Sequence, residues 1–315
     1  MQQFNANFLS ITFKLHRARL RDSLAVGGIM TICVAVKVHD CIVFAADSAS
    51  SLIDGGANGQ ALIANVYAHG NKVFNLRKGL PIAAMTCGMG NIGPISISTL
   101  AKDLRLKFCS NDPQWKINPQ NYSIEEIAKK ARTFFFEDHY QALPYKPAGD
   151  HEFQFWIGGN GSGAMHGEIW RIRIVNGESP EPECLATTGD FDVLYDGQPE
   201  AINRIVNGYS QFLPGALLDI GLSPDNLDAV LTHIETRTRA PVIAPAMPVQ
   251  DAIALADFLV DTTKKFVRFL PGADTVGGDT DICVVTKHEG FKWIRRKHYF
   301  DRRLNPVEDD HGAGA

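Results

Sequence analysis

The residue with the clearest chemical potential in this chain is Thr31, which opens the strand-like run 31–37. A threonine hydroxyl is a poor nucleophile at its ordinary pKa. It becomes an effective one when the α-amine of the same residue is free to take its proton, which requires the threonine to be the first residue of the mature chain. The chemistry open to this sequence therefore depends on whether the mature chain begins at Thr31.

Two charged residues follow Thr31 at the ends of strand-like runs. Asp47 closes the apolar run 41–47, sixteen positions after Thr31, and Lys72 opens the run 72–77. A carboxylate buried without a partner is strongly unfavourable, so a buried Asp47 would need a cation beside it. An ammonium group near the Thr31 hydroxyl would lower the pKa of that hydroxyl and stabilise the charge that develops on it.

The segment 31–51, TICVAVKVHDCIVFAADSASS, resembles the amino-terminal hairpin of the proteasome β-subunit family. That family has a catalytic threonine first, an acidic residue sixteen positions later and a lysine at the start of the third strand. Thr31, Asp47 and Lys72 occupy these places, and the resemblance spans roughly residues 31–295. It implies that Thr31 is the nucleophile, that its α-amine is the base, and that Lys72 pairs with Asp47 near the Thr31 hydroxyl.

The resemblance also implies an oxyanion hole in the small-residue loop 86–90. The family has a glycine loop in this place, and one of its backbone N–H groups stabilises the oxyanion. Gly88 is the expected donor here, and Cys87 or Met89 takes its place if the alignment shifts by one residue.

Two acidic residues stand near positions where the family has serines. Many members carry a serine in a turn before their third helix, and the matching segment 187–190 suggests Asp190 in its place. Asp274 resembles the family's carboxyl-terminal aspartate, but Gly277 stands where a second serine would follow. We therefore expect Asp190 and Asp274 to orient the α-amine. The Val-Gly-Gly sequence within 274–279 is most similar to bacterial homologues such as Anbu, the ancestral beta subunit, and the betaproteobacterial proteasome homologue.

Between Asp47 and Lys72 the chain has about nine more residues than typical members of the family, around 52–59. We expect this insert to form a loop beside the active site, where it would shape the substrate pocket. The insert also leaves Lys37 and Lys78 as alternative lysines for the site.

The first thirty residues allow three interpretations. Residues 1–30 are a propeptide removed before Thr31, or translation starts at Met30 and the initiator methionine is then removed, or the segment is a permanent extra helix that blocks Thr31. The segment lacks the pattern of a secretory signal.

Hydrophobic periodicity predicts strands and helices in alternating groups. One helix is expected to begin after Ser123, which precedes Glu126 in a capping-box pattern. The expected strands are 31–37, 41–47, 72–77, 80–86, 152–158, 167–175, 184–188, 281–287 and 291–296, and the expected helices are 92–108, 124–142, 196–211, 224–236 and 250–270.

This order of elements favours an α+β fold, a four-layer αββα sandwich of the Ntn-hydrolase type with two central antiparallel sheets. No composition break divides the chain, so residues 31–304 are expected to form one domain. Residues 305–315 are polar and glycine-rich and are expected to be a disordered tail.

Composition excludes several classes of function. The 315-residue chain is 45% hydrophobic and 21% charged with a net charge of −4, which indicates neither a nucleic-acid nor a membrane partner. The glycine-rich segment 158–163 lacks a phosphate-loop ending and is predicted to be a hairpin turn. No histidine or cysteine cluster has metal-ligand spacing, and no cofactor is expected. The six cysteines lack the spacing of a disulfide framework, which is typical of proteins from a reducing cytoplasm. They are Cys33, Cys41, Cys87, Cys109, Cys184 and Cys283.

Together these features favour a threonine-type peptidase that cleaves peptides or unfolded protein inside a ring or spiral of like subunits, as the resemblance implies. The sequence does not indicate whether an ATPase partner exists. Two alternatives remain: an Ntn amidohydrolase of the same fold that acts on a small amide, and a non-catalytic structural subunit.

Overall fold

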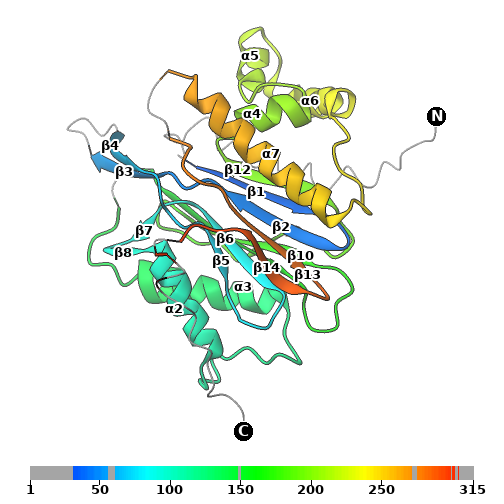
Figure 1. Ribbon diagram of the computed structural model, residues 1–315. Coiled ribbons are helices and arrows are strands. Elements are labelled where there is room, and N and C mark those ends of the chain that lie inside the picture. The colour runs from blue at the N-terminus through cyan, green and yellow to red at the C-terminus, as the bar shows by residue number, and fades with distance from the viewer. Residues whose placement is uncertain are drawn as a thin grey trace.

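The computed structural model describes residues 31–55, 61–147, 150–271, 275–298, 300–301 and 304. Two five-stranded antiparallel sheets form its centre (Figure 1). The first sheet has the order β12 (Asp192–Gly197), β1 (Ile32–Lys37), β2 (Cys41–Ala46), β13 (Asp281–Thr286) and β14 (Gly290–Arg295). The second has the order β11 (Glu183–Ala186), β10 (Glu168–Val175), β9 (Glu152–Gly159), β6 (Ile82–Gly88) and β5 (Val73–Asn75).

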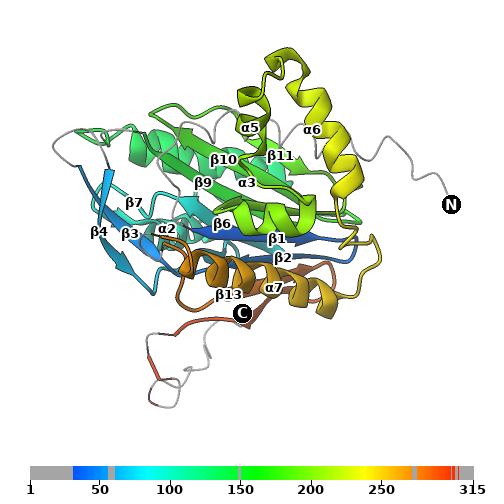
Figure 2. The same ribbon diagram turned by 90° about the horizontal axis from the view of Figure 1, so that it is seen from above.

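Helices cover the outer face of each sheet, as Figures 1 and 2 show. On the second sheet lie α2 (Ile97–Cys109) and α3 (Ile124–Arg132), which continues into the π-helix η1 (Thr133–Tyr140). On the first sheet lie α7 (Val249–Arg268), α4 (Glu200–Ile202) and the π-helix η2 (Asn203–Asn207), and α5 (Leu213–Asp219) and α6 (Pro224–Thr238) extend this side. The expected α+β sandwich of four layers is confirmed.

Strand β1 shows why the sequence folds into stacked sheets. Its alternate residues Ile32, Val34 and Val36 pack with α7, whereas Cys33 and Ala35 pack between the two sheets. Because both faces are covered, the strand is apolar throughout instead of alternating with polar residues.

Most predicted elements are confirmed to within a few residues, including the hairpin turn between β9 and β10. Ser123 caps α3 as expected, because its hydroxyl accepts the Glu126 N–H at 3.1 Å. The helix expected from residue 92 begins only at Ile97, because the preceding residues form the short strands β7 (Asn91–Ile92) and β8 (Ile95–Ser96). Ser96 then accepts the Thr99 N–H and caps α2.

Two predictions of local structure are wrong. The insert forms a two-stranded ribbon, β3 (Ser50–Gly55) and β4 (Ala61–Tyr67), where a loop was expected. The helix expected from residue 196 begins only after Pro199, because residues 192–197 form β12. Every residue of β12 pairs with β1, so tertiary pairing decides the conformation of this segment.

Among the described residues, no helix is long and apolar enough to cross a membrane. Residues 1–30 and 305–315, for which a leader and a tail were expected, lie outside the described residues.

Candidate active site

Thr31 lies immediately before β1 and is held from the side of β12. The Gln198 N–H donates to the Thr31 carbonyl at 2.8 Å. Gly197 has a φ of +106°, and a Cβ at this glycine would lie 2.0 Å from the Thr31 carbonyl oxygen. Only glycine permits this close approach, which fixes the backbone of a threonine that is 2% exposed.

Asp47 follows β2 and is completely buried. Its Oδ1 accepts the Thr31 hydroxyl at 2.7 Å and the Ile32 N–H at 3.1 Å. Its Oδ2 accepts the N–H groups of Ala49 and Gly277, each at 3.0 Å. This set of donors compensates the burial of the carboxylate and fixes its orientation.

Lys72 completes the cluster from the second sheet, where it lies directly before β5. Its Nζ lies 2.6 Å from Asp47 Oδ1 and also donates to Thr31 Oγ1. The Thr86 N–H donates to the Lys72 carbonyl at 2.9 Å and holds the backbone of Lys72. The structure thus brings together Thr31, Asp47 and Lys72, three residues from two sheets.

The two alternative lysines do not reach this cluster. Lys78 is exposed in the turn after β5. Lys37 lies at the other end of β1, six residues from Thr31 and roughly 20 Å away at the rise of an extended strand.

Gly88 ends β6 with a φ of +88°, and a Cβ there would lie 2.1 Å from the Glu152 carbonyl oxygen. Thr86 donates toward Lys72, and residues two apart in a strand direct their N–H groups to the same edge. The Gly88 N–H therefore faces the edge of β6 on which Lys72 lies. The alternative donor Met89 uses its N–H on the Glu152 carbonyl at 2.8 Å.

The structure does not bring Asp190 to Thr31, which corrects the expectation for this residue. The Asp190 carbonyl accepts from Lys37 Nζ, at the far end of β1. Its carboxylate accepts the Thr187 N–H at 2.7 Å and the Thr187 hydroxyl at 2.8 Å, so it stabilises its own turn. The sequence interpretation did not predict β12 and expected a helix from residue 196, so it took the turn at 187–190 as the one beside Thr31.

The acid that lies on the strand next to Thr31 is Asp196 in β12, which pairs with Cys33. Its Oδ1 accepts the Gly197 N–H at 2.7 Å, and its Oδ2 accepts from Gln154 Nε2 at 3.0 Å. The signal in the sequence was Asp196 followed by Gly197, two residues before Pro199 and the following helix. Asp274 lies outside the described residues, but Gly277, three positions later, contacts Asp47.

The groups around Gly88 have shifted pKa values. Burial raises the pKa of the Glu152 carboxyl, and the nearby charge of Asp196 raises it further. The Cys87 thiol hydrogen-bonds with Cys33 and is buried, and both effects raise its pKa well above the ordinary value. A thiol with a raised pKa stays protonated, so Cys87 does not compete with Thr31 as a nucleophile.

The described residues contain no group of histidine, cysteine and acidic side chains that could hold a metal ion.

No protein-family model matches this chain, and no curated protein matches it. Among solved structures, the chain is similar to the Gly-1 mutant of Anbu from Hyphomicrobium sp. strain MC1. The identity is 15%, the match covers 87% of this chain and 90% of that chain, and the TM-score is 0.48. Because a similarity at this level carries no argument about activity, we base the function on the geometry around Thr31.

Proposed function

We propose that this protein is a threonine-type hydrolase of the Ntn class, with Thr31 as its nucleophile. One observation carries the proposal: the Thr31 hydroxyl lies between the Asp47 carboxylate and the Lys72 ammonium group, in contact with both. A threonine that served only strand formation would not require a buried ion pair around its hydroxyl, because burying two charges is unfavourable unless they are precisely compensated.

The proposal requires that the mature chain begins at Thr31. Removal of residues 1–30, or translation from Met30 followed by loss of the methionine, would each expose the α-amine. Lys72 is a donor to the hydroxyl oxygen, and Asp47 is committed to four other donors. The α-amine of Thr31 is then the base that takes the hydroxyl proton, directly or through a water molecule.

In the reaction, Thr31 Oγ1 attacks the carbonyl carbon of an amide and its proton passes to the α-amine. The Gly88 N–H stabilises the oxyanion, and the positive charge of Lys72 stabilises the negative charge near Oγ1. When the carbon–nitrogen bond breaks, the leaving amine takes the proton from the α-ammonium group. Water then hydrolyses the ester on Thr31 and regenerates the hydroxyl.

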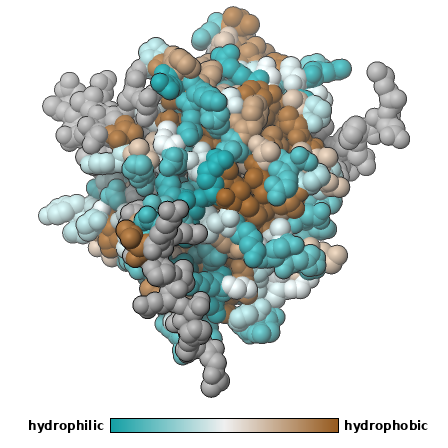
Figure 3. Space-filling model, viewed as in Figure 1, coloured by the Kyte–Doolittle hydropathy of each residue, from teal (hydrophilic) through white to brown (hydrophobic). Residues whose placement is uncertain are grey.

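We assign peptides or unfolded protein as the substrate and a ring or spiral of like subunits as the assembly. Large exposed apolar side chains support an interaction surface, namely Phe212 and Ile220 beside α5 and Phe258 and Phe269 on and after α7. In Figure 3 apolar side chains gather on the upper right of the molecule, over the side that carries α6 and α7. Contiguous exposed apolar area of this kind favours association.

We also propose a cytoplasmic location. All six cysteines are free thiols, and four of them are buried. Free buried thiols are typical of proteins from reducing compartments.

The test is hydrolysis of fluorogenic peptides by the wild type and by two variants, Thr31→Ala and Thr31→Ser. We expect no activity above background for Thr31→Ala and measurable activity for Thr31→Ser, which keeps a hydroxyl on the same atom. Peptidase activity that survives in Thr31→Ala would overturn the proposal. Cleavage of a small amide without cleavage of any peptide would keep Thr31 but replace the substrate class.

A further inference from the structure

A second buried polar network lies directly beside the Thr31 cluster. Lys297, which follows β14, places its Nζ 2.5 Å from Ser48 Oγ and 2.5 Å from Asp281 Oδ2. Ser48 is fully buried, and the side chains of Lys297 and Asp281 are 10% and 2% exposed. This network uses none of the groups of the Thr31 cluster, yet Ser48 is the residue that follows Asp47.

The direction of the hydrogen bonds in this network is fixed by chemistry. A lysine ammonium group only donates, so Ser48 Oγ must accept from Lys297. The hydroxyl proton of Ser48 is then directed to the Asp279 carbonyl, with which it forms a hydrogen bond. Lys297 therefore fixes the orientation of the Ser48 hydroxyl, which then donates its hydrogen bond to the segment 277–279.

The segment 277–279 in turn holds Asp47. The Gly277 carbonyl accepts the N–H groups of Ser48 and Ala49 at 2.9 and 3.1 Å, and the Gly277 N–H donates to Asp47 Oδ2. Gly278 passes so close to Ser48 that a Cβ on this glycine would lie 3.0 Å from the Ser48 Cβ. A shift of this segment would consequently remove one of the donors that orient the Asp47 carboxylate.

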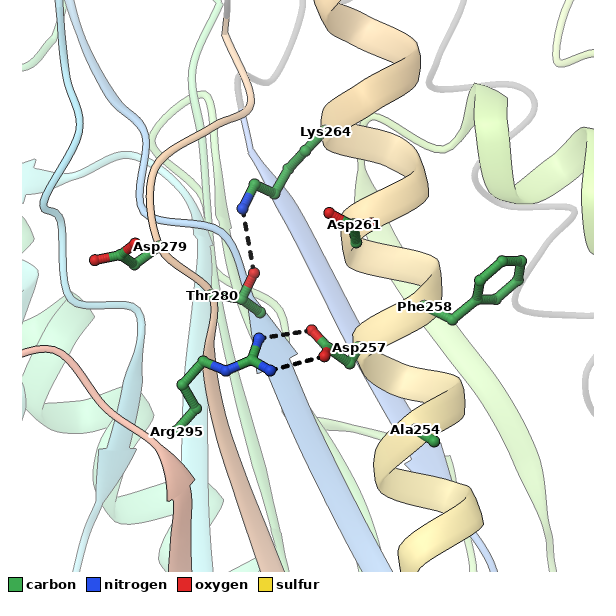
Figure 4. Close-up of a pocket in the computed structure, with 8 residues that line it drawn as sticks. All are labelled: Ala254, Asp257, Phe258, Asp261, Lys264, Asp279, Thr280 and Arg295. Atoms are coloured by element: carbon green, nitrogen blue, oxygen red, sulfur yellow. Dashed lines mark hydrogen bonds and ion pairs between the residues drawn. The ribbon is translucent and has the colours of Figure 1, made fainter.

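The end of β14, which leads into Lys297, also contacts α7. Arg295, two residues earlier, makes a two-point ion pair with Asp257 of α7 at 2.8 and 2.9 Å (Figure 4). This pair lines a cleft of about 540 Å³ whose wall includes Asp279 and Thr280. Arg295 and Lys297 thus leave the same strand end, but only Lys297 reaches toward the Thr31 cluster.

We propose that Lys297 is a positioning residue for the Thr31 site, acting through Ser48 and the segment 277–279 on Asp47. This inference rests on the proposed function, because it assigns Lys297 a role in the reactivity of Thr31. Small displacements of catalytic groups have large kinetic effects, since a shift of about 1 Å can cost about 100-fold in rate. The role differs from a purely structural one because it predicts slower chemistry in molecules that remain folded.

The experiment uses protein expressed from its native upstream DNA and a β-lactone that acylates Thr31. The rate constant of acylation is determined for each protein variant. The final extent of labelling gives the number of reactive sites, so the rate constant can be expressed per reactive site. Four variants are compared: Lys297→Met, Ser48→Ala, the double variant Asp281→Asn with Lys297→Met, and Arg295→Met. The double variant removes both buried charges, and replacing a buried pair in this way is tolerated far better than breaking it.

We expect the rate constant per site to fall about 10- to 100-fold in the first three variants, with KM for a peptide substrate nearly unchanged. Arg295→Met, the matched control on the same strand end, should stay within about threefold of the wild type because the side chains of its ion pair, Arg295 and Asp257, are 52% and 32% exposed and form no hydrogen bond or ion pair with Ser48 or Asp281. If Lys297→Met does not fold, Ser48→Ala decides, because that variant keeps the pair of Lys297 with Asp281. A wild-type rate constant in folded Ser48→Ala and in the folded double variant would overturn the inference. Absence of any adduct on wild-type Thr31 would instead remove the proposed function, and the inference with it.

Discussion

The two ends of strand β1 each bury a lysine, but they bury it in different ways. At the start of the strand, Lys72 lies 2.6 Å from the carboxylate of Asp47, and both contact the Thr31 hydroxyl. At the other end, Lys37 is fully buried and donates to the backbone carbonyl of Asp190. The Asp190 carboxylate is turned to its own loop instead.

The difference shows which feature indicates chemistry. Burial lowers the pKa of Lys37, and the charge of Asp190 opposes this shift only in part. Burial of a lysine on its own is therefore not evidence for a catalytic site. A lysine, a carboxylate and a hydroxyl that contact one another are better evidence, because each charge is compensated while the hydroxyl is activated.

The largest difference between the two ends should be in activity. Lys72→Met removes the positive charge beside the Thr31 hydroxyl and should lower kcat about 10² to 10³-fold, the range for loss of a preorganised electrostatic group. Lys37→Met is the matched control, and its kcat should stay within about threefold of the wild type. Steady-state peptide hydrolysis by both variants gives the comparison. Equal losses in the two variants would show that the ends of β1 do not differ in function.

The next largest difference should be in stability. Asp47→Ala leaves Lys72 buried without its counter-ion and should reduce the free energy of unfolding by about 3–5 kcal/mol. Asp190→Ala removes the hydrogen bonds to Thr187 and the charge near Lys37, but leaves the hydrogen bond from Lys37 to the backbone carbonyl, and should cost about 1–2 kcal/mol. Urea unfolding followed by circular dichroism measures both values. A larger loss in Asp190→Ala than in Asp47→Ala would reverse the assignment of the two carboxylates.

Two glycines extend the comparison to the backbone. Gly88→Ala places a Cβ against the Glu152 carbonyl and should lower kcat about 10²-fold through displacement of its N–H group. Gly189→Ala, next to Asp190, meets no atom within 4 Å and should change the free energy of unfolding by less than about 0.5 kcal/mol. Kinetics and urea midpoints are needed for both variants. Unchanged kcat in a folded Gly88→Ala variant would exclude Gly88 as the oxyanion donor.

The smallest effect concerns the pH dependence of stability at the Lys37 end. Because the pKa of Lys37 is lowered on folding from 10.5, the unfolded chain binds more protons between the lowered pKa and 10.5. The contribution of Lys37 to stability therefore rises with pH across this window and is least favourable below it. Near neutral pH, Lys37→Met should unfold at a higher midpoint urea concentration than the wild type. This difference should shrink as the pH approaches about 10. A difference that grows with pH would contradict the sign.

The strands and helices that carry the site were predictable because their signals are local. The continuous apolar runs of β1 and β2 predicted two buried strands, and Asp47 follows the second of them directly. The cluster of Thr31, Asp47 and Lys72 was predicted from the resemblance to the proteasome β-subunit family, because spacing alone does not distinguish it from ordinary residues at strand ends.

The predictions failed where pairing partners decide the conformation. A helix was expected from residue 196 and no element was expected at 192–195, but residues 192–197 complete the sheet beside β1 and bring Asp196 next to Cys33. The contact of Lys297 with Ser48 joins residues that are 249 positions apart in the chain. No local pattern indicates such a contact, because it depends on where the chain after β14 lies relative to the end of β2.

The most direct test of the central claim is the intact mass of the protein expressed from its native upstream DNA, before and after treatment with the β-lactone. We predict a chain that lacks residues 1–30, begins at Thr31 and gains one adduct on its amino-terminal peptide, and we predict no adduct in Thr31→Ala. A chain that begins at Met1 and gains no adduct would contradict the account, because Thr31 would then have no α-amine to act as its base.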